Sequence, residues 1–434
     1  MSTASISSSA RHAPDTPVAA MATRRLLYVE PEADGHHLAV YAAAIWEKLI
    51  GEGWTICWLT SHHAIRTATA IGLIHRFGAA LEVRPYSFLR IPNSGGRPMS
   101  WIRYQTHHRR ILNLAVPELV NEAPTACVFL PWLDYCDRSC GMFGLPEIGV
   151  PMAALHMHVS IHEPVGPNPS FMRRLSRSIT TRSLARLYTQ KNLKRIAVIM
   201  ETFASFARST GLPGSEKIVY IPDAGSLGDT PPRQASRERY SLAEGEVAIL
   251  CFGALTRRKG VDLLLAASRA FSGSASIVVI LAGKQEPEVR AMVARFQLGN
   301  KVSSMRLLVR DTFVDASEER SLFAASDIVW VGYPGFFGSS SVLIQAGCAC
   351  LPVVAGIQGE TGSAVREAQC GIACDLSSAT EVAAAVRTLA LEPDLRSRMG
   401  RNGAERSKHH SPQIFASNVL KMIEETAAQG ALAQ

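Results

Sequence analysis

CFGALTRRKGVDLLLAA, residues 251–267, joins a hydrophobic strand to an amphipathic helix. The strand ends at Gly253, the basic triplet Arg257, Arg258 and Lys259 follows, and Gly260 opens the helix. Parallel α/β sheets bind ligands where their strands end, and cations at that place suit a diphosphate. The stretch therefore predicts a strand–loop–helix unit with an anion site. An exposed basic loop would explain the triplet equally well, because most charge runs are solvated.

A second stretch, DIVWVGYPGFFGSSSVLIQAGCACLPVVAG at residues 327–356, contains a glycine-rich turn between a strand and a helix. The strand is expected to end near Tyr333, and the helix is expected from about Val342 to Ala349. Three serines, residues 339–341, stand where this helix begins. Serine is a good N-cap, and the free N–H groups of a helix start attract phosphate. The same residues also suit a helix cap that binds no ligand.

Hydrophobic runs alternate with helical stretches along most of the chain, which is the pattern of parallel α/β sheets. The expected strands are residues 24–30, 54–60, 125–133, 150–159, 195–201, 217–222, 247–253, 276–283, 305–309, 327–333 and 351–356. This order predicts two doubly wound, Rossmann-like domains. The expected division is a disordered tail at 1–22, a first domain at 23–225, a linker at 226–245, a second domain at 246–415, and a C-terminal helix and tail at 416–434.

Together the motifs resemble the donor domain of retaining GT-B glycosyltransferases of group 1, the family 4-like enzymes. The shared order is a strand, G-x-L-x-x-x-K-G, further strands, a glycine-rich turn with its helix, and P-V-V-A, from residue 247 to about 415. The resemblance implies a GT-B fold and retaining transfer of a sugar from a nucleoside-diphosphate sugar, without a resident cofactor or metal. The acceptor would be a glycan, a lipid-linked molecule or a small molecule bound by the first domain.

The resemblance also assigns roles to residues of the second domain, with Lys259 contacting the donor diphosphate. The expected donor-binding residues are Gly253, Arg257, Arg258, Lys259, Gly338, Ser339, Ser340, Ser341, Val342 and Gln345. The family usually has two glutamates eight positions apart, and here these positions are Phe337 and Gln345. The sequence therefore indicates a divergent branch. A non-catalytic GT-B binding subunit of a glycan assembly complex is the alternative function.

Histidines follow two strands of the first domain. The loop PEADGHH, residues 31–37, places Gly35, His36 and His37 where the family binds its acceptor. A second string, LHMHVSIH at residues 155–162, offers His156 and His158 as catalytic residues near the reacting sugar. In an extended strand the latter two face the same side. The alternatives are a helix start on a wet surface for the first group and ordinary core histidines for the second.

Composition limits the class of protein and its partners. The chain has 434 residues, 47% hydrophobic, with nine cysteines that form no zinc or disulfide pattern. Its net charge of +8 is diffuse, which favours anionic partners but not nucleic acid. Residues 1–22 lack the apolar core of a signal peptide, and no run is long enough to span a membrane. A cytoplasmic protein is expected.

One basic segment stands out, FMRRLSRSITTRSLARLYTQKNLKR at residues 171–195, which contains no acidic residue. A solvated helix that covers the sheet would explain it. The other interpretation is a docking surface for anionic lipid, because each basic residue near such a surface contributes about 1 kcal/mol. That interpretation predicts peripheral association with the inner face of the membrane, consistent with a lipid-linked acceptor.

Overall fold

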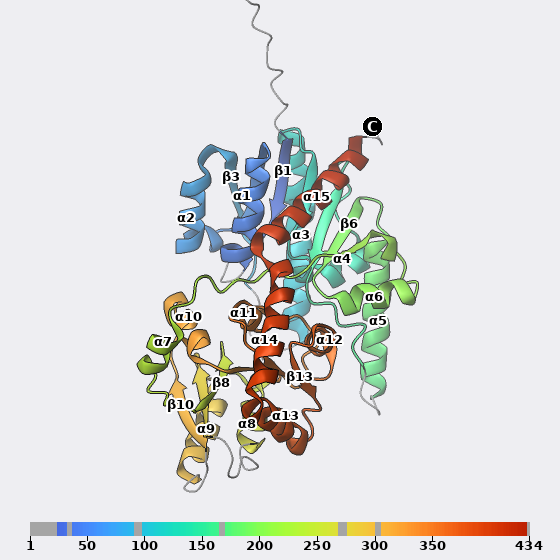
Figure 1. Ribbon diagram of the computed structural model, residues 1–434. Coiled ribbons are helices and arrows are strands. Elements are labelled where there is room, and N and C mark those ends of the chain that lie inside the picture. The colour runs from blue at the N-terminus through green and yellow to red at the C-terminus, as the bar shows by residue number, and fades with distance from the viewer. Residues whose placement is uncertain are drawn as a thin grey trace, which may run out of the picture.

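The computed structural model describes residues 24–32, 37–90, 98–164, 170–267, 276–299 and 305–431. Two α/β domains lie one above the other, each built around a parallel sheet with flanking helices (Figure 1). This is the expected pair of Rossmann-like domains. The expected tail at 1–22 lies outside the described residues.

The first domain contains a seven-stranded sheet in the order β3-β2-β1-β4-β5-β6-β7. Its strands are β1 (Arg24–Val29), β2 (Trp54–Ser61), β3 (Leu81–Tyr86), β4 (Cys127–Leu130), β5 (Met152–His156), β6 (Leu193–Val198) and β7 (Ile218–Tyr220). Its helical segments are η1 (His37–Ala42), α1 (Ala43–Gly51), η2 (Ala64–Arg66), α2 (Ala68–Phe77), η3 (Gly78–Ala80), α3 (Pro98–Glu122), η4 (Leu133–Tyr135), α4 (Asp137–Phe143), α5 (Phe171–Tyr188), α6 (Glu201–Ser209) and η5 (Ser215–Lys217).

The second domain contains a six-stranded sheet in the order β10-β9-β8-β11-β12-β13. Its strands are β8 (Val247–Phe252), β9 (Ile277–Ala282), β10 (Met305–Arg310), β11 (Ile328–Val331), β12 (Val353–Gly356) and β13 (Gly371–Cys374). The helical segments of this half are α7 (Arg233–Arg239), η6 (Arg257–Lys259), α8 (Val261–Ala267), α9 (Pro287–Gly299), α10 (Ala316–Ala325), α11 (Ser341–Cys348), α12 (Gly359–Ala368), α13 (Ala379–Leu391), α14 (Pro393–Ser407), η8 (Lys408–His410) and α15 (Pro412–Ala431).

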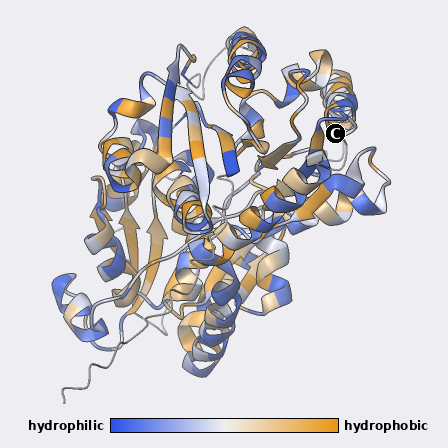
Figure 2. Cartoon of the chain, turned by 90° about the horizontal axis from the view of Figure 1, so that it is seen from above, coloured by the Kyte–Doolittle hydropathy of each residue, from blue (hydrophilic) through white to orange (hydrophobic). Residues whose placement is uncertain are grey.

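Central strands are apolar on both faces because helices cover both sides of a parallel sheet. All six residues of β9 are buried, as are all four of β4 and of β11. Figure 2 shows the hydrophobic residues concentrated along the strands of both sheets. Such continuous apolar runs are what made these strands predictable.

Two strands were not expected from the sequence, β3 and β13, and both lie at sheet edges. β3 reads LEVRPY, is buried only at its first residue, and carries Pro85, which an edge strand tolerates. β13 has four residues, of which only Cys374 is buried. An edge strand packs less completely than a central one, so its sequence lacks the apolar run that marks a buried strand.

The segment expected as a linker, residues 226–245, is folded onto the second domain. Leu227, Tyr240 and Leu242 belong to that domain's core, and α7 packs against α10. At the other end of the chain, α15 returns to the first domain, where Phe415 and Val419 join the core (Figure 1). The first domain therefore consists of two separate parts of the sequence.

The chain crosses between the domains twice, and the two crossings are hydrogen-bonded to each other. The Gly225 amide donates to the His410 carbonyl oxygen at 2.8 Å, and the His410 ring Nδ1 lies 2.9 Å from the Asp223 carbonyl oxygen. A second junction is formed by Glu360 of α12. Its buried carboxylate accepts hydrogen bonds from the amides of Glu201 and Thr202 at 3.1 and 3.0 Å, at the start of α6.

Candidate functional site

Loops that follow the strands of both sheets meet between the domains. On the first domain these loops follow β1, β4, β5 and β7, and on the second they follow β8 and β11. Asp223, after β7, accepts a 2.7 Å hydrogen bond from Ser339 of the second domain. The pKa of His158, after β5, is raised overall, and the positive charge of Arg258, after β8, opposes this rise, so the two side chains lie within electrostatic range of each other. The carboxyl ends of parallel strands are the usual ligand site of such folds.

His156 and His158 are brought together by one carboxylate, that of Asp134. The His158 amide donates to Asp134 Oδ1 at 2.7 Å, and the ring Nδ1 of His158 lies 3.5 Å from the same oxygen. The Nε2 atom of His156 lies 3.9 Å from it. Burial alone would raise the pKa of Asp134, but the two histidines lower it, so this carboxylate is ionised. Both histidines therefore lie close to the same carboxylate, although His158 follows the end of β5.

The two histidines differ in their exposure to solvent. His156 is fully buried, with Nδ1 2.8 Å from the Tyr188 hydroxyl and Nε2 3.5 Å from Asp137 Oδ2. Its buried side chain does not line the neighbouring pocket, so the catalytic role expected for His156 stays a prediction. The His158 side chain is 63% exposed. Desolvation lowers the pKa of His158, but Asp134 outweighs it and raises the pKa above its usual value.

Of the expected acceptor residues, His37 is described, while Gly35 and His36 lie outside the described residues. The His37 ring lies 4.4 Å from the Trp132 ring, centroid to centroid, and its Nδ1 is 3.8 Å from Glu30 Oε2. Glu30 is buried, which raises the pKa of its carboxyl group. His37 thus packs against Trp132, and Trp132 lines a pocket of the first domain.

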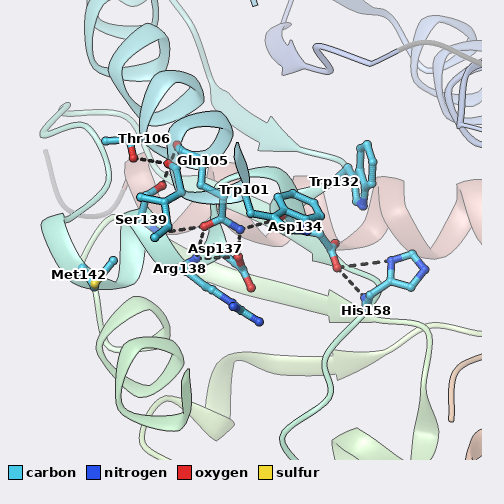
Figure 3. Close-up of a pocket in the computed structure, with 11 residues that line it drawn as sticks. Trp101, Gln105, Thr106, Trp132, Asp134, Asp137, Arg138, Ser139, Met142 and His158 are labelled. Carbon is cyan, nitrogen blue, oxygen red and sulfur yellow. Dashed lines mark hydrogen bonds and ion pairs between the residues drawn. The ribbon is translucent and has the colours of Figure 1, made fainter. Parts of the chain in front are cut away.

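That pocket, of about 640 Å³, lies in the first domain between α3, α4 and the loops after β4 and β5 (Figure 3). It is lined by Trp101, Ile102, Gln105, Thr106, Trp132, Asp134, Asp137, Arg138, Ser139, Met142 and His158. His158 therefore connects this pocket to the cleft and to the second domain. The sequence did not indicate the pocket, because its lining comes from four separate segments.

On the second domain, Lys259 lies beside the end of β8 as expected. Gly253 has φ of +99°, a conformation that favours glycine, and a side chain built there would lie 3.4 Å from Lys259 Nζ. The ammonium donates to the Tyr333 hydroxyl at 3.0 Å and stands 4.4 Å from the centroid of the Tyr333 ring. Burial and the neighbouring Arg258 lower the pKa of Lys259 to about 8.

The two arginines of the triplet point in different directions. Arg258 stacks on Phe336 of the glycine-rich turn, 4.7 Å from the ring centroid. Arg257 is exposed and lies 3.7 Å from the equally exposed Glu288. Arg257 also lines a second pocket, of about 440 Å³, at the ends of β12 and β13. No other expected donor residue lines that pocket, so Arg258 and Lys259 define the basic side of the cleft.

The glycine-rich turn and its serines lead into α11, which begins at Ser341. Ser340 stands at the N-cap and is buried, but its side chain makes no capping hydrogen bond. Ser339 donates to Asp223, and the Gly338 carbonyl oxygen accepts a 3.0 Å hydrogen bond from Thr361. Val342 is buried against the core of the second domain, so only its backbone can serve a ligand.

Asp223 was missed by the sequence analysis. Its carboxylate accepts hydrogen bonds from Tyr41 of η1 at 2.6 Å and from Ser339 at 2.7 Å, which ties the two domains together in the cleft. The only signal for it is an acidic residue after Pro222 at the end of a short strand. A single acid in a loop carries too little pattern to be singled out.

Gln345, at the position where the family resemblance predicts a glutamate, has an acidic partner. Its Nε2 donates to Glu319 Oε1 of α10 at 2.6 Å. Glu319 is half-buried, and desolvation raises the pKa of its carboxyl group. At the other position where the resemblance predicts a glutamate, the carbonyl oxygen of Phe337 accepts a hydrogen bond from the Glu360 amide at 2.8 Å. A carboxylate therefore stands beside Gln345, supplied from a neighbouring helix.

The fold and the cleft define a GT-B architecture, two Rossmann-like domains with strand ends that face each other. Residues 232–406, from α7 to α14, match the family model described as glycosyl transferases group 1. The second domain is therefore similar in sequence to the group 1 glycosyl transferases. A search of curated proteins finds no match to the chain.

Solved structures with low sequence identity share the whole arrangement. Sucrose-phosphate synthase from Thermosynechococcus elongatus is 14% identical, with a TM-score of 0.67 over 94% of this chain and 100% of that one. WaaG, a glycosyltransferase involved in lipopolysaccharide biosynthesis, is 14% identical, with a TM-score of 0.63 over 92% and 99%. HepE from Anabaena, in complex with UDP and glucose, is 13% identical, with a TM-score of 0.62 over 93% and 100%. These likenesses show the fold.

Proposed function

We propose that the protein transfers a sugar, with retention, from a nucleoside-diphosphate sugar to an acceptor bound on its first domain. The observation that carries this is the buried Lys259 beside Gly253, at a strand end within a domain similar in sequence to the group 1 glycosyl transferases. A partly desolvated cation gains from a diphosphate that arrives beside it. Solved neighbours bind UDP and UDP-glucose, which supports a uridine diphosphate sugar as the first donor to test.

The cleft supplies further donor contacts under this proposal. Arg258 and the amides at the start of α11 would stabilise the negative charge that develops on the leaving diphosphate. Gln345 and its partner Glu319 would hold the ribose hydroxyls, the task of the glutamate that the chain lacks. His158, on the facing domain, would contact the transferred sugar, and Asp134 orients it. His156 acts through Asp134 and is a positioning residue.

Retention describes the stereochemistry and rests on the family resemblance. In such a transfer the acceptor oxygen bonds to the anomeric carbon on the side from which the diphosphate leaves. The bond between that carbon and the phosphate oxygen breaks, and the diphosphate leaves with the electron pair and takes the acceptor's proton. No metal is required for this step, and closure of the two domains would exclude water.

Calorimetry with UDP-glucose and UDP tests the donor site directly. We expect Lys259→Ala to weaken binding by about 1.5–3 kcal/mol, the range for hydrogen bonds to charged groups. Lys421→Ala is the matched control, because Lys421 is an exposed lysine of α15 on the first domain. If other nucleotide sugars bind instead, the same pair of variants applies to them. Equal affinity in both variants would remove Lys259 from the site.

A second candidate function is a non-catalytic binding subunit of a glycan assembly complex. Phe337 favours it, because a phenyl ring replaces a carboxylate that normally stands beside the sugar. This candidate shares the donor site but predicts no turnover. Release of UDP in the presence of acceptors therefore separates the two functions.

We also propose peripheral contact with an anionic membrane through the segment 171–195. The first turns of α5 extend away from the sheet, whereas Leu184 and Leu187 near its end are buried (Figure 1). Phe171 and Met172 are 70% and 69% exposed, with Leu175 and Ile179 also exposed. Arg174 is exposed among them. Exposed apolar side chains beside cations are the composition of a membrane-contacting helix. No described helix is long and apolar enough to cross a membrane.

A further inference from the structure

The pocket beside His158 identifies the kind of acceptor. Four of its lining side chains are large and apolar, namely Trp101, Ile102, Trp132 and Met142. Figure 3 shows Trp101, Trp132 and Met142 around the pocket. Trp101, Ile102 and Met142 are 45%, 57% and 49% exposed, which is unusual for large hydrophobic side chains that stand together. A volume of about 640 Å³ falls in the range of small-molecule sites.

Most polar side chains of the pocket form hydrogen bonds within the protein. Gln105 Nε2 donates to Asp137 Oδ1 at 2.7 Å, and its Oε1 accepts the amides of Arg138 and Ser139. The Ser139 hydroxyl donates to the Gln105 and Cys136 carbonyl oxygens, and Thr106 donates to the Ile102 carbonyl oxygen. These bonds hold α3 against α4 and use the donor hydrogens of Gln105, Ser139 and Thr106, so these side chains offer a ligand few free donors.

The carboxylate of Asp134 likewise forms hydrogen bonds within the protein. It accepts the amides of Met157 and His158 at 3.0 and 2.7 Å. Among the described residues, the Arg138 guanidinium and the His158 Nε2 atom make no hydrogen bond. Few polar groups of the pocket are thus free to bind a ligand, and one of them, His158 Nε2, lies at the end of the pocket that faces the second domain.

This distribution distinguishes two classes of acceptor. A free glycan carries hydroxyl groups over its whole surface, and each buried one that finds no partner costs free energy. A molecule with an apolar body and one hydroxyl group would bury the body against the tryptophans and leave the hydroxyl beside His158. Only the second class matches walls that are mostly apolar, with free polar groups at Arg138 and His158.

We infer that the acceptor is a hydrophobic alcohol or phenol whose apolar body fills this pocket and whose hydroxyl group points past His158 to the donor. The inference rests on the proposed function for the transfer step but not for binding. In that step the hydroxyl oxygen bonds to the anomeric carbon of the donor sugar. The carbon–phosphate oxygen bond breaks, and the nucleoside diphosphate leaves with its electron pair and the acceptor's proton.

Binding to the full chain tests the inference without any turnover. The probes are 1-naphthol, a rigid soluble phenol, decanol, a lipid-like chain, and maltose, a free glycan, each titrated by calorimetry. We expect saturable binding of an apolar alcohol and no binding of maltose. Tighter binding of 1-naphthol would indicate a soluble acceptor, and tighter binding of decanol would indicate a membrane lipid as the acceptor. Binding of UDP-glucose is measured in parallel, so that a failed donor site and a failed acceptor pocket are told apart.

Two variants of α3 locate the bound probe. Ile102→Asn places a polar group on the pocket wall and should weaken binding of the alcohol about tenfold, the effect of losing roughly half of a buried side chain. Leu114→Asn is the matched control, since Leu114 is 59% exposed in the same helix and does not line the pocket. Preferred binding of maltose, absence of binding by both alcohols, or equal affinities in the two variants would overturn the inference.

Discussion

At the residue scale, Lys259 connects the sequence motif with a physical property that can be measured. Its ammonium is buried against Tyr333 and Gly253 rather than extended into solvent. Burial disfavours the charged form and lowers the pKa to about 8. A lysine that is partly desolvated before the ligand arrives loses little hydration when a diphosphate binds.

The lowered pKa predicts how donor affinity changes with pH. Below pH 8 the free protein carries a charged Lys259, and binding needs no proton. Above pH 8 the amine is neutral, and a bound diphosphate favours its protonation, so each further pH unit should weaken binding by up to about tenfold. Calorimetry from pH 7 to 9.5 should show a dissociation constant that is flat and then rises.

Lys259→Arg is the control for this pH profile, because a guanidinium stays protonated throughout the range. The affinity of this variant for the donor should stay constant between pH 7 and 9.5, even if it differs from that of the unmodified protein. A flat profile for the unmodified protein would mean that Lys259 does not bind the diphosphate as a cation.

At the element scale, the junction between α12 and α6 gives the domains a fixed point. Glu360 is buried, and its carboxylate also accepts a 2.6 Å hydrogen bond from the Thr202 hydroxyl. Glu360→Ala should lower the free energy of unfolding by about 1.5–3 kcal/mol, because hydrogen bonds to a buried charge are lost. Urea denaturation measures this change.

Glu367→Ala, in the same helix, is the matched control. Glu367 is exposed and accepts a hydrogen bond only from Ser363 among the described residues. Its loss should change the stability by less than about 0.5 kcal/mol. Similar values for the two variants would show that the junction does not hold the domains.

The N-terminal turns of α5 offer the second prediction at this scale. Phe171→Ser with Met172→Ser should reduce pelleting with anionic vesicles, while leaving the fold intact because both side chains are exposed. Arg174→Ser should reduce it at low salt only, since salt screens the charge. Leu391→Ser, an exposed apolar residue of α13, is the control. Equal pelleting with neutral vesicles would contradict the membrane proposal.

The elements also show what can be predicted from sequence. Buried strands such as β8 and β9 are continuous apolar runs, and Lys259 follows β8 within a motif that predicts a ligand site. The edge strands β3 and β13 lack such runs. Asp223 and the pocket under Trp132 depend on contacts between distant segments, which no local pattern records. The burial of His156 likewise depends on Tyr188, thirty-two positions away.

At the scale of the whole molecule, the proposed function divides one reaction between the two domains. Under it, the second domain would bind the diphosphate with Lys259, Arg258 and the start of α11. The first would bind the acceptor in the pocket beside His158. The paired crossings at Gly225 and His410 and the contact between Asp223 and Ser339 keep the two domains opposed. Domain closure in such proteins brings the reacting groups together and excludes water.

Turnover is the most direct test of this account. Purified protein is mixed with UDP-glucose, or with the nucleotide sugar that binds best, and with 1-naphthol or decanol, and the release of nucleoside diphosphate and the glycosylated product are both measured. We predict equal amounts of the two, a product with the anomeric configuration of the donor, and loss of both signals in Lys259→Ala. A protein that binds the donor but yields no product with any apolar, lipid-linked or glycan acceptor would contradict it and would identify a binding subunit instead.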